Sequence, residues 1–206
     1  MAERFPIAVL ASGAGSNLQA ILDSVHGRDG IEVVAVGSNK ADAPALARAQ
    51  ALGVATAAFP RAEHADRAAR DLALADWIEQ SGARLVVLAG YMELLTPEFL
   101  ARFPQAVVNV HPALLPAFPG LRAVEQAIEH GVRVFGVTVH YVDEGVDTGP
   151  IILQRAVELP YARDADEVLA RLHPVEHELL PEAIRLIARG AVRPDPASPR
   201  RVTLDP

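Results

Sequence analysis

The sequence predicts an α/β fold of the Rossmann-like type, in which helices cover both faces of a mostly parallel, twisted sheet. The first observation is that short apolar runs alternate with stretches of helical periodicity along most of the chain. The second is that glycine follows several of the helical stretches, where it commonly ends a helix. Because helical crossovers return the chain to the same end of a sheet, this alternation favours parallel strands.

The expected strands coincide with seven apolar runs. Short runs flanked by turn residues are typical of buried strands. The last two runs are longer, and we expect them to form C-terminal strands that are antiparallel to each other. In chain order the runs are 7–11, 32–37, 54–59, 85–89, 106–111, 134–141 and 151–159.

The expected helices occupy stretches between these runs. Asp42 is a suitable N-cap for the second helix, and Gly53 is a suitable stop for it. The last helix is long and C-terminal, and Pro174 and Pro181 should kink or split it because each removes a backbone donor. The helices span 17–25, 42–52, 64–80, 121–130 and 164–189.

The domain organisation predicted from the sequence is simple. The chain shows no internal repeat, linker or low-complexity segment. We therefore expect a single domain over residues 1–193. The proline-rich stretch 194–206 is expected to form an extended C-terminal tail.

The composition is that of an ordinary globular protein and excludes several kinds of chemistry. Its 206 residues suffice for a sizeable core, and 50% of them are hydrophobic. The net charge of −7 argues against a nucleic-acid-binding surface. Cysteine is absent, which removes disulfides, thiolate metal sites and cysteine nucleophiles. No apolar stretch reaches membrane-spanning length and no leader segment is evident, so we expect a cytoplasmic protein with no membrane partner.

Asn109 and His111 end a predicted strand and are the most informative residues of the chain. They follow the apolar residues 106–108 and are two apart, so on a strand both side chains point to the same face. Pro112 ends the strand immediately afterwards. Ligands of open α/β sheets bind beyond the carboxyl ends of the strands, so an Asn and a His at this point indicate a site. A histidine that is simply buried in the core is the plainer alternative for His111 alone.

The turn Asp147-Thr148-Gly149-Pro150 supplies a carboxylate that could lie against the His111 imidazole. Such a partner would favour the charged form of the histidine. Asp-X-Gly-Pro is also an ordinary turn sequence. A purely structural role for Asp147 therefore stays open at this point.

A glycine-rich turn over residues 12–17, Ser-Gly-Ala-Gly-Ser-Asn, follows the first strand and opens the first helix. Amides at the helix N-terminus, with the side chains of Ser16 and Asn17, could hold a phosphate. A dinucleotide site would need a third glycine, where Leu18 stands, and an acidic residue, where residues 38–40 read Ser-Asn-Lys. The Gly-Lys-Ser/Thr of a P-loop is also missing. The turn therefore favours a monophosphate, with a plain capped turn as the alternative.

Two further segments carry weaker signals. His173, Glu176 and His177 match the H-x-x-E-H pattern of inverted zinc proteases, but Pro174 interrupts it and no acidic helix follows, so we expect no metal. Glu176 is better suited to hold a substrate amine or hydroxyl, unless it lies on a solvated helix face. The segment 88–95 leaves a buried strand as an apolar loop, which could wall a flat aromatic ligand or merely pack.

Six segments together resemble the folate-dependent formyltransferase family. The Asn-x-His-Pro-x-Leu-Leu-Pro stretch is specific to folate formyl transfer, and the early Gly-x-Gly-Ser-Asn loop narrows the resemblance to the glycinamide ribonucleotide branch. The segments run in family order over nearly the whole chain. They are 12–19, 38–42, 87–92, 109–116, 136–140 and 147–152.

The resemblance implies a direct transfer reaction. The amine of glycinamide ribonucleotide would attack the formyl carbon of 10-formyltetrahydrofolate, which serves as the co-substrate. Asn109 and protonated His111 would stabilise the oxyanion, and Asp147 would assist proton transfer. The resemblance implies neither a covalent enzyme intermediate nor a metal.

The resemblance also assigns binding residues. Gly15, Ser16 and Asn17 match a substrate phosphate loop, and Glu176 matches a substrate-contacting glutamate. The partners implied are small molecules only, with the protein a monomer or a homodimer. The implied folate contacts are Arg67, Met92, Glu93, Leu94, Leu95, Asn109, Asp143, Glu144, Gly145, Val146 and Asp147.

Three positions depart from the family pattern. Glu93 stands where a basic residue is usual, which alters the charge near the folate mouth. Ala117 replaces a residue that is often lysine or serine. Pro174 interrupts the helix that bears Glu176.

Three other functions compete with formyl transfer to glycinamide ribonucleotide. A formyltetrahydrofolate hydrolase shares the Asn, His and Asp set but usually has an N-terminal regulatory domain, for which a first strand at Ile7 is expected to leave no room. A methionyl-tRNA formyltransferase would need a further C-terminal domain and a less acidic chain. A non-enzymatic nucleotide-binding module would explain the glycine-rich turn but not why Asn109, His111 and Asp147 occur together.

Overall fold

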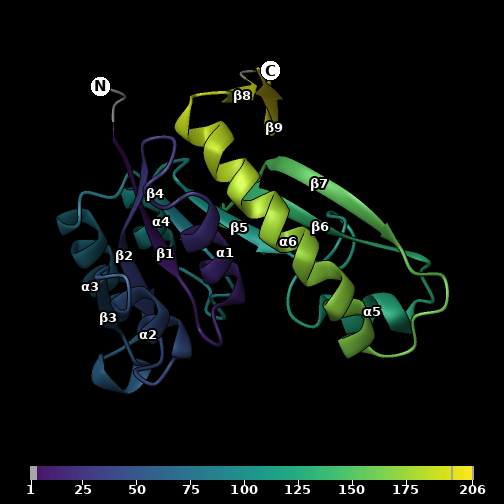
Figure 1. Ribbon diagram of the computed structural model, residues 1–206, viewed down its shortest axis with the longest axis horizontal. Coiled ribbons are helices and arrows are strands. Elements are labelled where there is room, and N and C mark those ends of the chain that lie inside the picture. Colours follow the sequence, from purple (N-terminus) through teal and green to yellow (C-terminus); the bar gives the residue numbers. More distant parts are fainter. Residues whose placement is uncertain (1–3, 196, 206) are drawn as a thin grey trace. The chain divides into compact units, whose positions relative to one another are not determined.

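The computed structural model describes residues 4–195 and 197–205, and its fold is α/β (Figure 1). Two compact units make up the chain, residues 1–109 and 110–206. The boundary between them falls within strand β5 (Val107–His111). The expectation of a single domain over residues 1–193 stays a prediction.

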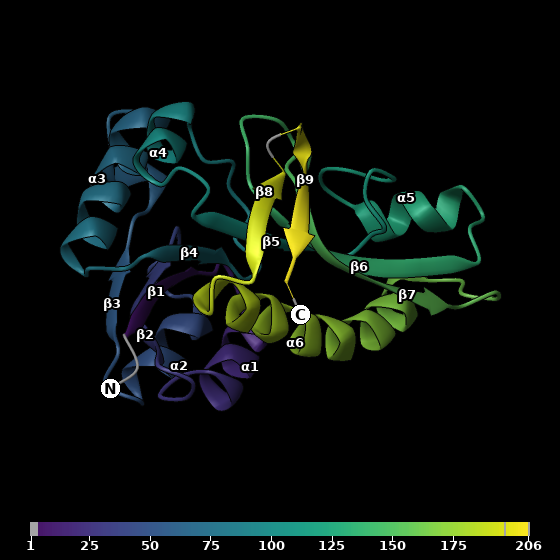
Figure 2. The ribbon, with the colours of Figure 1, turned by 90° about the horizontal axis from the view of Figure 1, so that it is seen from above.

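The first unit consists of parallel strands covered by helices on two sides. Its elements are, in chain order, β1 (Phe5–Leu10), α1 (Ser16–Ser24), β2 (Ile31–Ser38), α2 (Pro44–Gln50), β3 (Ala55–Ala58), the single 3-10 turn η1 (Arg61–Glu63), α3 (Arg67–Gln80), β4 (Leu85–Leu88) and α4 (Pro97–Arg102). Strand β1 lies between β2 and β4, and β3 pairs with the other edge of β2. Figure 2 shows α3 and α4 on one face of these strands and α1 and α2 on the other.

The strand order confirms the predicted fold class. Strand β5 pairs in parallel with β4, whereas β6 (Val134–Tyr141) and β7 (Ile151–Glu158) pair antiparallel, as expected for these two longer runs. The seven strands follow one another in the order β3-β2-β1-β4-β5-β6-β7. Strands β1 and β4 are buried on both faces, which explains why their sequences are continuous apolar runs without alternation.

The helices of the first unit differ from the expected ones at two helix starts and by one additional helix. Asp42 does not cap α2, because that helix begins at Pro44, whose fixed φ suits the first helical position. Helix α3 begins at Arg67 rather than at residue 64, because Asp66 caps it by accepting a hydrogen bond from the Ala69 amide at 2.8 Å. Helix α4 was not expected at all, although the Thr96 cap followed by proline is a recognisable start signal.

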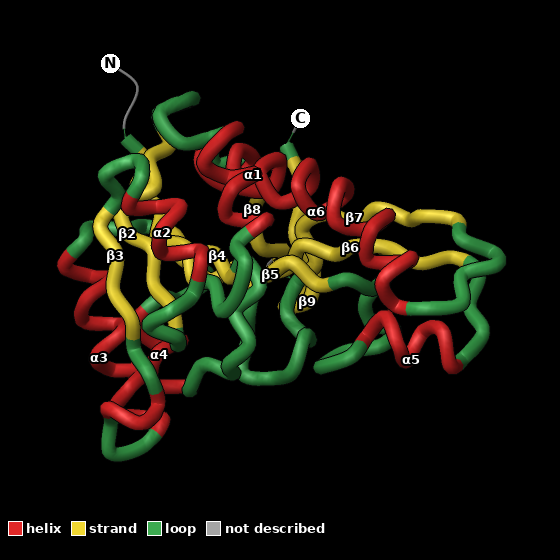
Figure 3. The backbone as a smooth tube through the Cα atoms, turned by 60° about the horizontal axis from the view of Figure 1, so that its bottom comes forward, coloured by secondary structure: helices red, strands yellow, loops and turns green. Residues whose placement is uncertain are grey.

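The second unit packs two helices against the β6–β7 pair. These helices are α5 (Ala123–Glu129) and the long C-terminal α6 (Ala165–Ala188). The views in Figures 1 and 3 show α6 lying along β6 and β7, and it contacts both strands. The predicted antiparallel strands and long C-terminal helix are therefore confirmed.

The expected split of the last helix is wrong. Helix α6 runs without interruption over 24 residues, with Pro174 and Pro181 inside it. Each proline removes one helical hydrogen bond, but α6 also buries an apolar stripe that includes Leu172, Leu180 and Ile184. Tertiary packing of such a stripe supplies most of a helix's stability and offsets the missing bonds.

The chain beyond α6 forms an antiparallel pair, β8 (Val192–Asp195) with β9 (Ser198–Leu204). An extended conformation was expected from residue 194 onward, but not the pairing of the two strands. Residues 196 and 206 lie outside the described part of the chain. Within the described residues, no helix has the length and apolar character needed to cross a membrane.

Candidate active site

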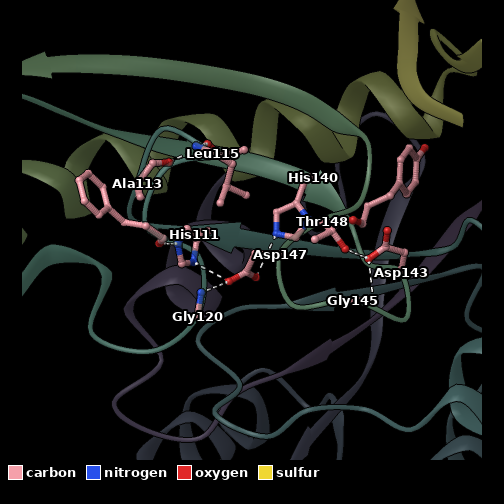
Figure 4. Close-up of polar contacts among 12 residues, drawn as sticks. His111, Ala113, Leu115, Gly120, His140, Asp143, Gly145, Asp147 and Thr148 are labelled. Carbon is pink, nitrogen blue, oxygen red and sulfur yellow. Dashed lines mark hydrogen bonds and ion pairs between the residues drawn. The ribbon is translucent and has the colours of Figure 1, made fainter. Parts of the chain in front are cut away.

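Three groups of the second unit converge on the carboxylate of Asp147 (Figure 4). The Gly120 amide donates a hydrogen bond to Oδ2 at 2.7 Å. The same oxygen lies 3.4 Å from Nδ1 of His111, and Oδ1 lies 3.5 Å from Nε2 of His140. The side chain of Asp147 is only 15% exposed, so water screens these contacts weakly. The sequence prediction that Asp147 lies against His111 agrees with this geometry.

The backbone around Asp147 is shaped by a tight loop. Asp147 itself has φ +53°, the left-handed region that favours glycine or Asp/Asn. Asp143 closes the loop by accepting hydrogen bonds from the Gly145 amide and the Thr148 hydroxyl, at 3.1 and 2.7 Å. A Cβ on Gly149 would lie 1.9 Å from the Tyr141 carbonyl oxygen, so only glycine fits there. The Asp-Thr-Gly-Pro sequence is therefore a turn-former as well as the source of the carboxylate.

His111 is held by acceptors on both ring nitrogens. Its Nε2 lies 2.8 Å from the carbonyl oxygen of Phe118, which can only accept, so Nε2 carries a proton and donates. Its Nδ1 faces Asp147, and a proton there makes that contact favourable as well. The segment from Phe118 to Gly120 thus contacts both His111 and Asp147 through backbone atoms.

The electrostatics of the cluster keep Asp147 ionised. Burial by itself would raise the pKa of this carboxyl group. The hydrogen bonds from His140 and Gly120, together with the nearby His111, outweigh burial and lower the pKa of Asp147 to about 2. Asp147 is therefore an anion throughout the neutral range.

His140 is a functional candidate that we did not select from the sequence. It is buried, and its Nδ1 donates to the Tyr141 carbonyl at 2.7 Å, which leaves Nε2 directed at Asp147. It lies at the end of β6, just as His111 lies at the end of β5. The rule that selected His111, a polar residue at the carboxyl end of a buried strand, applies equally to His140.

Asn109 occupies β5 two residues before His111. It is half-buried, whereas Val108 and Val110 on either side of it are buried. Both residues belong to β5 and are two apart, so the expectation that their side chains share one face of the strand stays a prediction.

The glycine-rich turn of the first unit is held by α2. Gly15 has φ +74°, and a Cβ there would lie 2.8 Å from Cβ of Ala45. The Gly13 and Ala14 carbonyls accept hydrogen bonds from the Ala45 amide and from Nε of Arg48, at 3.2 and 2.8 Å. Because N–H and C=O point in opposite directions across a trans peptide, the amides that follow these carbonyls point away from α2.

The remaining residues of the predicted phosphate site begin α1. Ser16 is exposed and Asn17 is buried. Gly15 is the N-cap residue, and no side chain caps this helix. The helix start therefore offers its backbone amides and the exposed Ser16 hydroxyl to an anion.

The predicted folate contacts of the first unit are presented on its surface. Met92 and Leu94 are 66% and 58% exposed, which is unusual for such large apolar side chains. Glu93 and Leu95 are partly buried, and Arg67 is exposed at the first position of α3.

The other predicted binding residues belong to the second unit. Residues 143–146 form most of the loop before Asp147, and Val146 is 44% exposed. Glu176 lies on α6 and is buried, in contrast to a solvated helix face. His173 and His177 stack one helical turn apart with ring centroids separated by 6.3 Å. Among the described residues, no three His, Asp or Glu side chains gather as a metal site would require.

Comparison with known proteins shows which family the chain belongs to. A sequence profile of the formyl transferase family matches residues 5–184. The phosphoribosylglycinamide formyltransferase of Haemophilus influenzae is 41% identical over 188 residues, which cover 91% of this chain and 89% of that protein. The enzyme of the same name from Escherichia coli is 40% identical, with the same coverage. The crystal structure of glycinamide ribonucleotide transformylase 1 from Symbiobacterium toebii superposes with a TM-score of 0.94, at 46% identity over 99% of this chain and 95% of that one.

These matches place the chain in a class of one-carbon transferases. The chain belongs to the formyl transferase family, in the branch formed by the phosphoribosylglycinamide formyltransferases. It is an enzyme that transfers formyl groups.

Proposed function

We propose that this enzyme transfers the formyl group of 10-formyltetrahydrofolate to the amine of glycinamide ribonucleotide, a step of purine biosynthesis. The products would be N-formylglycinamide ribonucleotide and tetrahydrofolate. The observation that carries the proposal is the buried carboxylate of Asp147, held ionised between His111 and His140. The names and coverage of the relatives support the choice of substrates.

The first step forms a tetrahedral intermediate. The amine nitrogen of the ribonucleotide attacks the formyl carbon, and the carbonyl oxygen becomes an oxyanion. Asn109 and protonated His111 donate hydrogen bonds to it, each worth about 3 kcal/mol in comparable sites. In the structure, the Phe118 carbonyl accepts a hydrogen bond from Nε2 of His111. During the reaction the oxyanion takes the place of this carbonyl as the acceptor. Phe118 borders an apolar cavity of about 280 Å³, which gives its segment room to shift.

The second step expels the folate. The attacking nitrogen loses a proton, N10 of the folate gains one, the bond between the formyl carbon and N10 breaks, and the new amide remains. Asp147 assists by passing the proton on. Because the pKa of Asp147 is about 2, its protonated form is short-lived and the carboxylate is quickly restored.

The binding roles follow the family resemblance. The amides of Gly15, Ser16 and Asn17 bind the phosphate of the ribonucleotide, and Glu176 binds one of its polar groups. The folate contacts Arg67, Asn109, the segment 92–95 and the loop 143–147. No step requires a metal.

A mixing experiment tests this proposal. The purified protein is incubated with 10-formyltetrahydrofolate, with and without glycinamide ribonucleotide, and release of tetrahydrofolate is followed by absorbance. Release that depends on the ribonucleotide supports the transferase. Equal release in both samples identifies a hydrolase, and no release in either sample refutes both.

A further inference from the structure

A buried network of charges ties three parts of the first unit together. Arg70 on α3 is fully buried, and its Nε and Nη2 donate to Oδ1 of Asp71 at 2.9 and 2.7 Å. Its Nη1 forms an ion pair with Oε2 of Glu93 at 3.0 Å. Glu93 also accepts from Nδ2 of Asn39, just after β2, at 3.2 Å. The second oxygen of Asp71 accepts from the Thr96 amide at 2.8 Å.

This network fixes both ends of one short segment. Glu93 is held from the protein interior by Arg70, and Thr96 is held by Asp71. A further contact holds the start of the segment, because the Met92 amide donates to Oγ of Ser12 at 2.8 Å. The segment 92–96 therefore has little freedom, although it lies outside helices and strands.

Two large apolar side chains project from this fixed segment. Met92 and Leu94 are exposed on either side of Glu93, whose own side chain is 28% exposed. An apolar surface held rigidly before its ligand arrives binds with a smaller loss of entropy. Such a surface suits the flat ring system of a folate.

The negative charge of Glu93 is balanced by Arg70 and stabilised by a hydrogen bond from Asn39. Burial would raise its pKa, but the ion pair with Arg70 and the hydrogen bond from Asn39 lower it overall. Tyr91 adds no charge, because burial raises the pKa of its hydroxyl to about 12. An acidic residue therefore fits at this position without presenting an unpaired anion to a folate.

We propose that Arg70 is a positioning residue for folate binding, which acts through Glu93 and Asp71 to hold Met92 and Leu94 in place. Arg70 is fully buried and does not touch the ligand itself. Only an arginine can form the paired bonds to Asp71 and reach Glu93 at once, because lysine lacks the planar fork. The inference rests on the proposed function, since the folate contact of residues 92–95 belongs to it.

Three variants test this role: Arg70→Lys, Glu93→Gln and the two combined. We expect Arg70→Lys to raise KM for 10-formyltetrahydrofolate about tenfold, while kcat and KM for glycinamide ribonucleotide change less than about threefold. The effect of Glu93→Gln on the folate KM should be much smaller in the Arg70→Lys background than alone, because both act through one contact. The affinity of Arg70→Lys for tetrahydrofolate, measured by calorimetry, should fall by a similar factor.

The matched control is Glu98→Gln, which removes an exposed carboxylate from the same unit and should leave both KM values unchanged. If Arg70→Lys folds and keeps the normal folate KM, or raises both KM values alike, Arg70 has no positioning role. If Arg70→Lys does not fold, normal folate affinity in Glu93→Gln overturns the proposal. An unaltered protein without transferase activity would instead refute the proposed function.

Discussion

Each unit of the molecule contains a cluster of ionisable side chains, and the two clusters are built differently. In the first unit, Asp71 and Glu93 face the guanidinium of Arg70. In the second, Asp147 faces the imidazoles of His111 and His140. Guanidinium does not give up its proton in proteins, whereas imidazole exchanges protons near neutral pH.

The partners of each carboxylate determine what the cluster can do. Asp71 uses both oxygens in short, directed bonds to groups that never change charge. Asp147 accepts a short bond from the Gly120 amide and lies at the longer distances of 3.4 and 3.5 Å from two rings that can exchange protons. The first arrangement is suited to holding backbone in place and the second to chemistry.

The largest expected effect is that of His111→Ala. Loss of one oxyanion donor and of the positive charge beside Asp147 should lower kcat about 10³-fold, because these groups act mainly in the transition state. Steady-state kinetics measure this effect, and thermal unfolding serves as the control for folding. A kcat within tenfold of the unaltered enzyme would remove His111 from the mechanism.

The comparison is sharpest when the two aspartates are changed in parallel. Asp147→Asn should fold normally and lower kcat about 10²-fold, since the amide keeps the shape but not the charge. Asp71→Asn should instead cost about 3 kcal/mol of stability, because Arg70 loses a buried partner, and should change kcat only a few-fold. Kinetics and urea unfolding of both variants would show the contrast. Similar profiles for the two would mean that the clusters do not differ in role.

A smaller effect is expected for His140→Asn. The His140 ring contacts Asp147, and in the proposed mechanism it does not contact the reacting atoms itself. Its role is therefore to orient the carboxylate. We expect kcat to fall about tenfold with both KM values nearly unchanged. A loss as large as that for His111→Ala would give His140 a direct catalytic role.

The cluster of the second unit could be predicted in large part from the sequence, whereas that of the first unit could not. Asn109, His111 and Asp147 could be proposed as site residues because polar residues at strand ends and in an Asp-X-Gly-Pro turn are local signals. The alternation of apolar runs and helical stretches likewise predicted a mostly parallel α/β sheet, and β6 began and ended where the apolar run did.

Contacts between residues far apart in the chain could not be predicted in the same way. Arg70 looks like any charged residue of an amphipathic helix, and only the folded chain brings it to Glu93. The contact between the Phe118 carbonyl and His111 could not be predicted either, because a backbone acceptor has no sequence signature. The prediction that Pro174 and Pro181 split the last helix was wrong for a related reason. The packing that keeps α6 continuous comes from β6 and β7, which lie outside the sequence of the helix itself.

Acid unfolding provides the last and smallest test of the comparison. The pKa of Asp147 is lowered from 3.8 to about 2, so its charged form stabilises the folded protein above about pH 4 and this contribution disappears as the pH falls towards 2. The lowering corresponds to about 2 kcal/mol. The difference in unfolding free energy between the unaltered protein and Asp147→Asn should shrink by about this amount between pH 5 and pH 2, as measured with urea. A constant difference over that range would show that the histidines and Gly120 do not hold the carboxylate in its charged form.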